Sequence, residues 1–210
     1  MFFGICRYKI NNPKRGANKC IMKDMYEDVK TGIDRFILQQ KNCCKIGCAF
    51  CCYQTIEVID IEIDAIKDFL VNKIDEITKE KIKENLKEYF IFFNKNTPNN
   101  KILDEHDLIN HFQDIANTSK CKCPLLIENK CSIYEGRPLA CRIHVVEKNP
   151  EICEAEPYRD SAPLAINVRG SLLQYVLSKK KTYIIPLAYL IAEALMPEME
   201  LKPIKKLYMN

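Results

Sequence analysis

The stretch Cys43-Cys44-Lys45-Ile46-Gly47-Cys48-Ala49-Phe50-Cys51-Cys52 places five cysteines within ten residues. Packing alone does not explain this density, because closely spaced thiols are typical of ligands for borderline and soft metals. A second group of five follows downstream: Cys121, Cys123, Cys131, Cys141 and Cys153. We expect the second group to fold back onto the first. The sequence thus indicates a cysteine-ligated metal centre, with the rest of the chain as its scaffold.

Whether the twelve cysteines bind metal or form disulfides depends on the cell compartment of the protein. Residues 1–7 carry no basic segment ahead of their apolar residues and are too short for a secretory signal, so we expect a cytoplasmic protein. Clustered cysteines in a reducing compartment more often bind metal than form disulfides. Adjacent cysteines also bridge each other only with strain. A disulfide scaffold is the structural alternative.

Length and charge limit the remaining classes. The 210 residues suit one domain, 1–210, with the cysteine cluster core at about 40–155. A net charge of +4, from 32 basic and 28 acidic residues that are interspersed, is too weak to indicate a nucleic acid partner. The most apolar late stretch, 183–196, is about fourteen residues and falls short of a membrane span of roughly twenty. We therefore expect neither nucleic acid nor membrane as a partner, and a protein partner or substrate stays open.

Apolar periodicity predicts a mainly α fold, a single-domain helical bundle with a long cysteine-rich metal-binding loop. Helices are expected over residues 22–37, from an N-cap at Asp60 through 70, over 75–94, over 102–116, from Ser161 onward, and over 183–195. Residues 55–59 are β-branched and suit a short extended segment. The span 117–160 reads as a long loop, ordered by metal rather than by secondary structure.

The first cysteine group is then expected just past the end of a helix. Gly47 lies inside it and is free to take a backbone angle that a side chain resists. Cys48 and Cys51 form a CxxC motif, which zinc sites and redox dithiols share. The flanking cysteines and the lack of a βαβ pattern disfavour a thioredoxin-like site.

Three segments together resemble the YkgJ-type cysteine cluster family, which is described as a zinc- or iron-chelating domain. They are Cys44-Lys45-Ile46-Gly47-Cys48-Ala49-Phe50-Cys51-Cys52-Tyr53, Cys123-Pro124-Leu125-Leu126 and Cys131-Ser132-Ile133-Tyr134-Glu135-Gly136-Arg137-Pro138-Leu139-Ala140-Cys141-Arg142. The resemblance implies eight metal ligands: Cys44, Cys48, Cys51, Cys52, Cys123, Cys131, Cys141 and Cys153. Whether Cys43 replaces Cys44 stays open, because some members have two residues between the first two cysteines. Cys6, Cys20 and Cys121 have no counterpart and are expected to be free or packing cysteines.

Eight thiols are twice the four that one zinc ion or one iron–sulfur cluster takes. Three alternatives follow: one 4Fe-4S cluster with spare thiols, one or two zinc sites, or a multinuclear centre. We favour an iron–sulfur cluster as cofactor, because the family resembles the domain in flagellin lysine N-methylases, where an iron–sulfur centre is implied. The alternatives in function are a zinc-binding protein, a metal carrier, or a metal-dependent protein lysine methyltransferase of the flagellin methylase type. The sequence lacks a glycine-rich nucleotide loop, and it indicates no catalytic residue.

Three further residues are expected at the centre. Arg137 and Arg142 bracket Cys141 and suit an anionic thiolate cluster, with Tyr134 beside them. A salt bridge that fixes the loop, to Glu135 or a neighbour, is the alternative role for the arginines. His144 is the one histidine near the cluster and a candidate ligand. The other two, His106 and His111, are five residues apart, so they do not share a helix face, and they are expected to be surface or hydrogen-bonded histidines.

Overall fold

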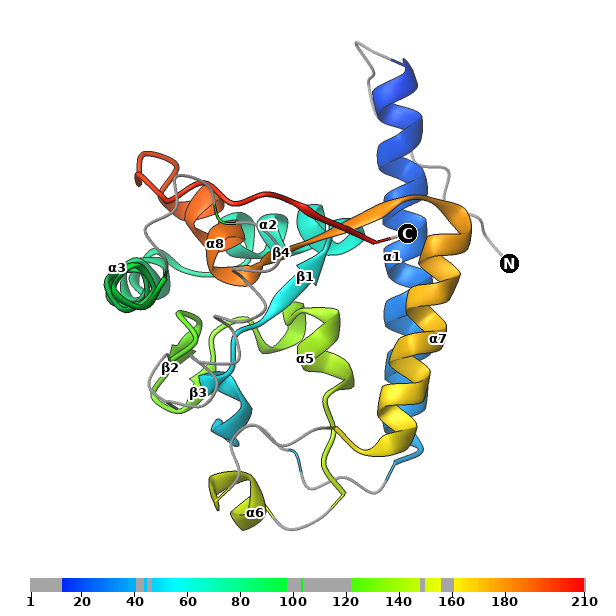
Figure 1. Cartoon of the computed structure of the whole chain (residues 1–210), viewed down its shortest axis with the longest axis horizontal. Coiled ribbons are helices and arrows are strands. Elements are labelled where there is room, and N and C mark those ends of the chain that lie inside the picture. Colours follow the sequence, from blue (N-terminus) through cyan, green and yellow to red (C-terminus); the bar gives the residue numbers. More distant parts are fainter. Residues whose placement is uncertain are drawn as a thin grey trace.

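The structure is a computed structural model. It describes residues 13–40, 44, 47–97, 103, 122–147, 150–155 and 161–209. The fold is mainly helical, as predicted, with two small sheets (Figure 1). Within the described residues, no helix is both long and apolar enough to cross a membrane. The elements in chain order are α1 Pro13–Leu38, η1 Phe50–Tyr53, β1 Glu57–Ile59, η2 Asp60–Glu62, α2 Ile63–Asn72, α3 Glu76–Asn96, β2 Leu126–Ile127, β3 Lys130–Cys131, η3 Tyr134–Gly136, α5 Leu139–Ile143, α6 Pro150–Ala155, α7 Pro163–Lys179, β4 Thr182–Pro186, α8 Leu187–Leu195 and β5 Leu207–Met209.

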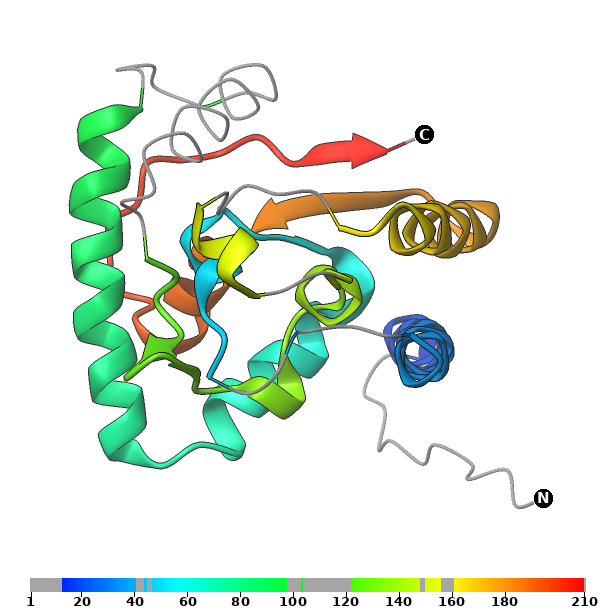
Figure 2. The ribbon, with the colours of Figure 1, turned by 90° about the horizontal axis from the view of Figure 1, so that it is seen from below.

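Two groups of helices flank the larger sheet. One group is α1 and α7, which run alongside each other at one side of the molecule (Figures 1 and 2). The other group is α2, α3 and α8, in which α3 lies crosswise to α1 and α7. Strand β4 extends from the end of α7 toward α8 and so spans the two sides. The short elements η1, β2, β3 and α5 lie between the two groups of helices, which is where the cysteines gather.

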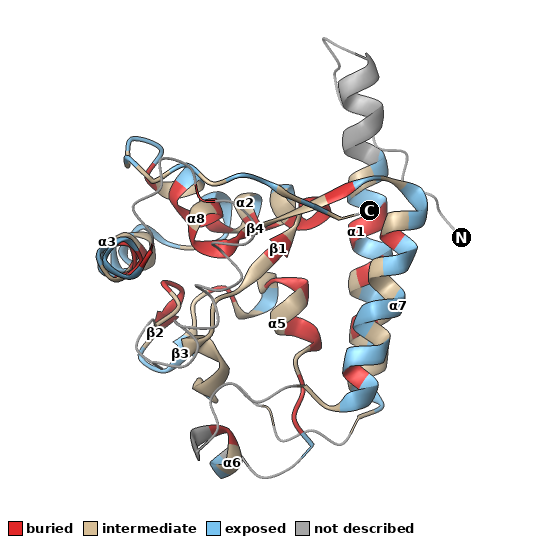
Figure 3. Cartoon of the chain, viewed as in Figure 1, coloured by how far each residue is buried: buried red, intermediate tan, exposed pale blue. Residues whose placement is uncertain are grey.

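The first core cluster joins α2, α3 and α8. The buried residues of these helices, coloured red in Figure 3, pack against one another. Aromatic rings dominate the contact between α3 and α8, because Tyr189 meets Phe90 and Phe93 edge-on with ring centroids 5.2 and 5.8 Å apart. Such edge-to-face pairs add to the free energy gained from burying the rings. This core cluster packs against one side of the cysteine segments.

The second core cluster joins α1, α5 and α7. Val29 and Ile33 of α1 are buried together with Ile143 of α5 and Val176 of α7. Leu172 of α7 packs over Gly32 of α1, where a Cβ would make an ordinary van der Waals contact of 3.5 Å with Leu172 Cδ2. The predicted helices over 22–37 and from Ser161 onward are confirmed by α1 and α7. They position α5 and thus Cys141.

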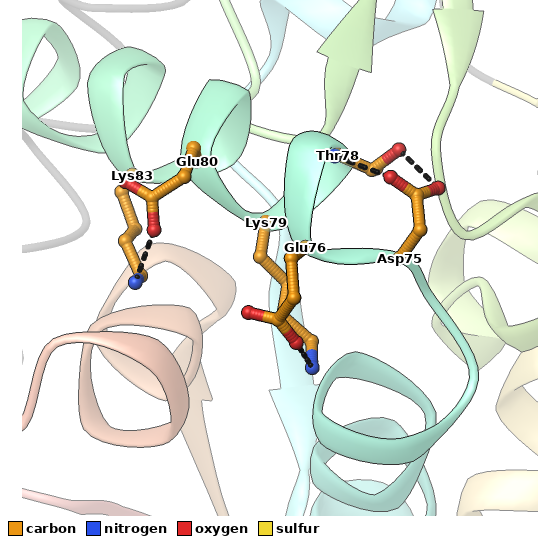
Figure 4. A network of polar contacts seen from close by, with 6 residues as sticks. All are labelled: Asp75, Glu76, Thr78, Lys79, Glu80 and Lys83. Carbon is orange, nitrogen blue, oxygen red and sulfur yellow. Dashed lines mark hydrogen bonds and ion pairs between the residues drawn. The ribbon is translucent and has the colours of Figure 1, made fainter.

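Helix α3 confirms the helix predicted over 75–94, and its start is capped by side chains (Figure 4). Asp75 is the N-cap, and its carboxylate accepts hydrogen bonds from both the backbone N and Oγ1 of Thr78 at 2.8 Å. Such a cap satisfies amide groups that have no partner inside the helix. Two exposed ion pairs follow on the next turns, Lys79–Glu76 at 2.6 Å and Lys83–Glu80 at 2.7 Å.

The helix predicted over 183–195 is wrong at its start. Residues 182–186 form β4, which pairs antiparallel with β1 on one side and β5 on the other. Val58 lies opposite Ile185, and Tyr183 lies opposite Tyr208. A short apolar run suits a buried strand as well as a buried helix, and here the partner strands decide. The helix α8 begins only at Leu187, after Pro186.

Asp60 is not the N-cap that the sequence predicts. It lies in η2, is only 4% exposed, and accepts hydrogen bonds from Lys180 Nζ and Thr182 Oγ1. The carboxylate therefore ties β1 and η2 to the start of β4 instead of capping α2. The extended segment predicted at 55–59 is confirmed in part by β1. The helix predicted over 102–116 lies outside the described residues except for Leu103, which forms a bridge with Ile204.

Substitution Asp60→Ala should lower the free energy of unfolding by about 3 kcal/mol, because it leaves Lys180 and the buried Thr182 hydroxyl without their acceptor. Urea denaturation measures the change. Asp28→Ala is the matched control, since Asp28 accepts only an exposed bond of 3.3 Å from the Tyr175 hydroxyl and should change the value by less than about 0.5 kcal/mol. Equal losses in both variants would contradict the assigned role of Asp60.

Candidate metal centre

The first cysteine group follows α1 directly, as predicted. Gly47 takes φ +92°, in the left-handed region that favours glycine, so the expectation for this residue is confirmed. The chain then forms η1, in which the amide of Cys52 donates to the carbonyl oxygen of Ala49 at 2.9 Å. This tight turn places the adjacent Cys51 and Cys52 beside each other, and both line the same cavity.

The second cysteine group is more ordered than the predicted loop. The segment contains β2, β3, η3, α5 and α6, and β2 pairs with β3 as a two-residue hairpin. The two turn residues, Glu128 and Asn129, have φ values of 50° and 59°, which is the conformation of a type I′ turn. The hairpin brings Cys131 opposite Leu126, close to Cys123. Backbone pairing and short helices therefore order the described part of this segment.

A backbone hydrogen bond joins the two groups. The amide of Cys123 donates to the carbonyl oxygen of Cys52 at 2.7 Å, so the second group does fold back onto the first. Asn85 of α3 holds the same segment from the other side, because its Nδ2 donates to the carbonyl oxygens of Pro124 at 3.0 Å and Leu126 at 3.3 Å. These bonds fix the backbone of the cysteine segments to the helical scaffold.

Glu62 anchors α5, the helix that carries Cys141. Its carboxylate is buried and accepts hydrogen bonds from the amides of Leu139 at 2.7 Å and Ile59 at 2.9 Å. Burial raises the pKa of Glu62 to about 7, although the two amide donors and the guanidinium of Arg142 lower it. The carboxyl group links η2 to the start of α5, a role that sequence patterns alone did not indicate.

Seven of the eight predicted ligands line one cavity of about 210 Å³. They are Cys44, Cys48, Cys51, Cys52, Cys123, Cys131 and Cys141. Cys153 is buried in α6, which packs against η1, but it does not line this cavity. Cys6, Cys43 and Cys121 lie outside the described residues, and Cys20 lies in α1. The eight predicted ligands are not joined to one another by disulfide bonds.

The cavity thiols differ in acidity. The pKa of Cys51 is lowered to about 7, mainly by a hydrogen bond from Cys52 and also by the nearby guanidinium of Arg137, against the effect of burial. The same hydrogen bond and burial raise the pKa of Cys52. Burial raises the pKa of Cys131 and, most strongly, of Cys141, where neighbouring thiols add to the effect. Several thiols this close in a buried site cannot all ionise unless a cation compensates their charge.

The two arginines near Cys141 are both at the cavity. Arg137 stacks on Tyr134, with its guanidinium carbon 4.1 Å from the ring centroid. Arg142 donates to Asp34 Oδ1 at 2.9 Å and to the carbonyl oxygen of Glu135 at 2.5 Å. These contacts fix the loop, which is the alternative role that the sequence left open for the arginines. Yet Nε of Arg137 and Nε of Arg142 are buried and have no hydrogen-bond partner among the described residues. Two donors without acceptors thus lie in the wall of a thiol-lined cavity.

These residues fit a thiolate-bound metal group. Within the part of the chain that the structure describes, no three Cys, His, Asp or Glu side chains are close enough together to hold one metal ion. The thiols instead surround a cavity, and the unpartnered Nε–H groups suit an anionic group that accepts hydrogen bonds through sulfur. The donor set therefore fits a zinc or iron group that is held by thiolates.

Substitution Gly47→Ala should lower the free energy of unfolding by about 1–2 kcal/mol, because an L side chain resists a φ of +92°. It should also weaken metal binding, since Gly47 directly precedes Cys48. Thermal unfolding and metal titration measure the two effects. Gly170→Ala in α7 is the control: it meets no atom within 4 Å and should stabilise the helix by up to about 1 kcal/mol. An unchanged free energy of unfolding in Gly47→Ala would contradict the interpretation that this turn requires glycine.

A family model matches residues 42–159, more than half of the chain. The model is named CxxCxxCC and is described as "Putative zinc- or iron-chelating domain". Searches of curated proteins and of solved structures found no match. The matched segment contains both cysteine groups and therefore all seven cysteines that line the cavity. The chain therefore belongs to the CxxCxxCC, YkgJ-type family of cysteine-rich zinc- or iron-chelating domains.

Proposed function

We propose that this protein holds an iron–sulfur cluster of the 4Fe-4S type between its two cysteine groups. The observation that carries the proposal is the arrangement of seven thiols around one cavity of about 210 Å³. When bound, such a cluster supplies one-electron redox chemistry or a structural tie between the segments that ligate it. The ligands would come from the seven cavity cysteines, with Cys153 in the adjoining helix α6.

The spread of the thiols favours a cluster over a single zinc ion. Tetrahedral zinc needs four ligand atoms that converge on one point, with sulfurs at about 2.3 Å from the metal. Among the described residues no three candidate side chains converge in this way. A cluster is ligated at several iron atoms, so its cysteines surround it at wider spacing. A cluster in the cavity would use thiols from around its wall.

Apolar side chains complete the cavity wall and would exclude water from the group. Ile37, Ile56, Leu125, Val145 and Leu187 come from five different segments of the chain and all line it. A hydrophobic shell controls solvent access to a metal site and thus its reduction potential. The amide of Leu187 donates to the carbonyl oxygen of Ile56 at 2.8 Å, which fixes this part of the wall.

The arginines supply the positive charge that an anionic cluster needs. Arg137 lowers the pKa of the Cys51 thiol, and the buried Nε–H groups of Arg137 and Arg142 lack acceptors within the described structure. Hydrogen bonds to cluster sulfurs would satisfy both donors. The cytoplasm, where thiols stay reduced, is the compartment in which we expect this centre to form.

Protein purified without oxygen should be brown and contain iron and acid-labile sulfide in equal amounts, about four of each per chain. Metal analysis and a visible absorption spectrum measure this. A colourless protein with stoichiometric zinc would contradict the iron–sulfur proposal.

Substitution Cys141→Ser should lower the affinity for the metal group at least about 10-fold, because loss of even an outer-shell partner costs 10–100-fold. Cys20→Ser is the matched control, since Cys20 precedes the segment that the family model matches. We expect it to keep full metal content. Equal metal content in the two variants would show that Cys141 is not a ligand.

A further inference from the structure

His144 stands at the same cavity as the thiols. It is the C-cap residue of α5, three positions after Cys141, and its half-buried side chain lines the cavity together with the seven cysteines. Imidazole nitrogen binds both zinc and iron, so its presence in a thiol-lined wall adds a second type of donor. Neither the family description nor the cysteine spacing assigns a role to this residue.

The orientation of the His144 ring is held by a serine. Ser161 Oγ lies 2.8 Å from His144 Nδ1. Ser161 immediately precedes Ala162, whose amide donates to the carbonyl oxygen of Val145 at 2.9 Å. The backbone bond thus ties the segment after His144 to the start of α7, and it keeps the hydroxyl group beside the ring.

This contact matches the way proteins orient histidine ligands. A histidine that binds metal through one ring nitrogen donates the hydrogen of its other nitrogen to an acceptor, which fixes the tautomer and the ring direction. With Nδ1–H donating to Ser161 Oγ, the neutral ring carries its lone pair on Nε2. Nε2 is the nitrogen that is then able to bind metal.

We propose that His144 is a metal ligand through Nε2, so that the centre has mixed cysteine and histidine ligation, and that Ser161 is the residue that positions the ring. The proposal rests on the proposed function in that a metal group occupies the thiol-lined cavity. A neutral imidazole in place of a thiolate makes the centre less negative and raises its reduction potential, as in clusters with histidine ligands. His144 would thus set the potential of the centre.

The test is pulsed electron–nuclear double resonance on the reduced protein. With natural histidine, the cluster signal should show a ¹⁴N coupling, which becomes a ¹⁵N coupling when the chain contains ¹⁵N-labelled histidine. His144→Gln should lose this coupling, whereas His111→Gln should keep it. Absence of a histidine coupling in the wild-type chain, or its persistence in His144→Gln, would overturn the proposal.

A second variant keeps the test decisive if His144→Gln fails to retain the cluster. His144→Cys offers a thiolate at the same position, so it should retain iron, lose the nitrogen coupling and shift the midpoint potential downward. An unchanged nitrogen coupling in this variant would also overturn the proposal.

The ligand assignment can be tested separately from the identity of the metal. If the purified protein holds zinc, the iron–sulfur proposal fails, and X-ray absorption at the zinc edge tests His144 instead. A first shell of sulfur with one nitrogen, which becomes all sulfur in His144→Cys, would support ligation by His144. A first shell of sulfur alone in the wild-type protein would overturn it.

Discussion

The hydrogen bond from the amide of Cys123 to the carbonyl oxygen of Cys52 is the contact on which the centre depends. It joins two cysteine segments that the chain separates by α2 and α3. Because both partners are backbone groups, the contact tolerates a change of either side chain. The helices then act as supports: Asn85 of α3 holds the Cys123 segment, and Glu62 holds the start of α5. The thiol-lined cavity follows from this arrangement of the backbone.

The fold was predictable where the signal is local. The periodicity of α1, α3 and α7 and the glycine conformation at Gly47 are properties of neighbouring residues. The prediction failed where distant segments decide. Residues 182–186 form a strand because β1 and β5 pair with them, and Asp60 turns inward because Lys180 and Thr182 meet it there. The hairpin turn at Glu128 and Asn129 lacks the glycine that marks most type I′ turns, so local residue patterns do not indicate it.

The candidate site shows the same division. Spacing and family resemblance located the cysteines, and seven of the eight meet at one cavity. The supports were not predictable, because the partner of Arg142 is Asp34 on α1, and the carboxylate that anchors α5 comes from Glu62 at the end of η2. Ser161 and His144 are likewise separated in the chain and are brought together by the return of the backbone at Val145 and Ala162. Long-range contacts of this kind carry no periodic signal.

The central claim is that thiols from both cysteine groups surround one multi-iron centre. X-ray absorption at the iron edge of protein purified without oxygen tests it most directly, because the spectrum reports both the ligand atoms and neighbouring metal atoms. We predict a first shell dominated by sulfur, followed by a clear iron–iron scattering shell. A first shell of oxygen and nitrogen, or iron without an iron neighbour, would contradict the account.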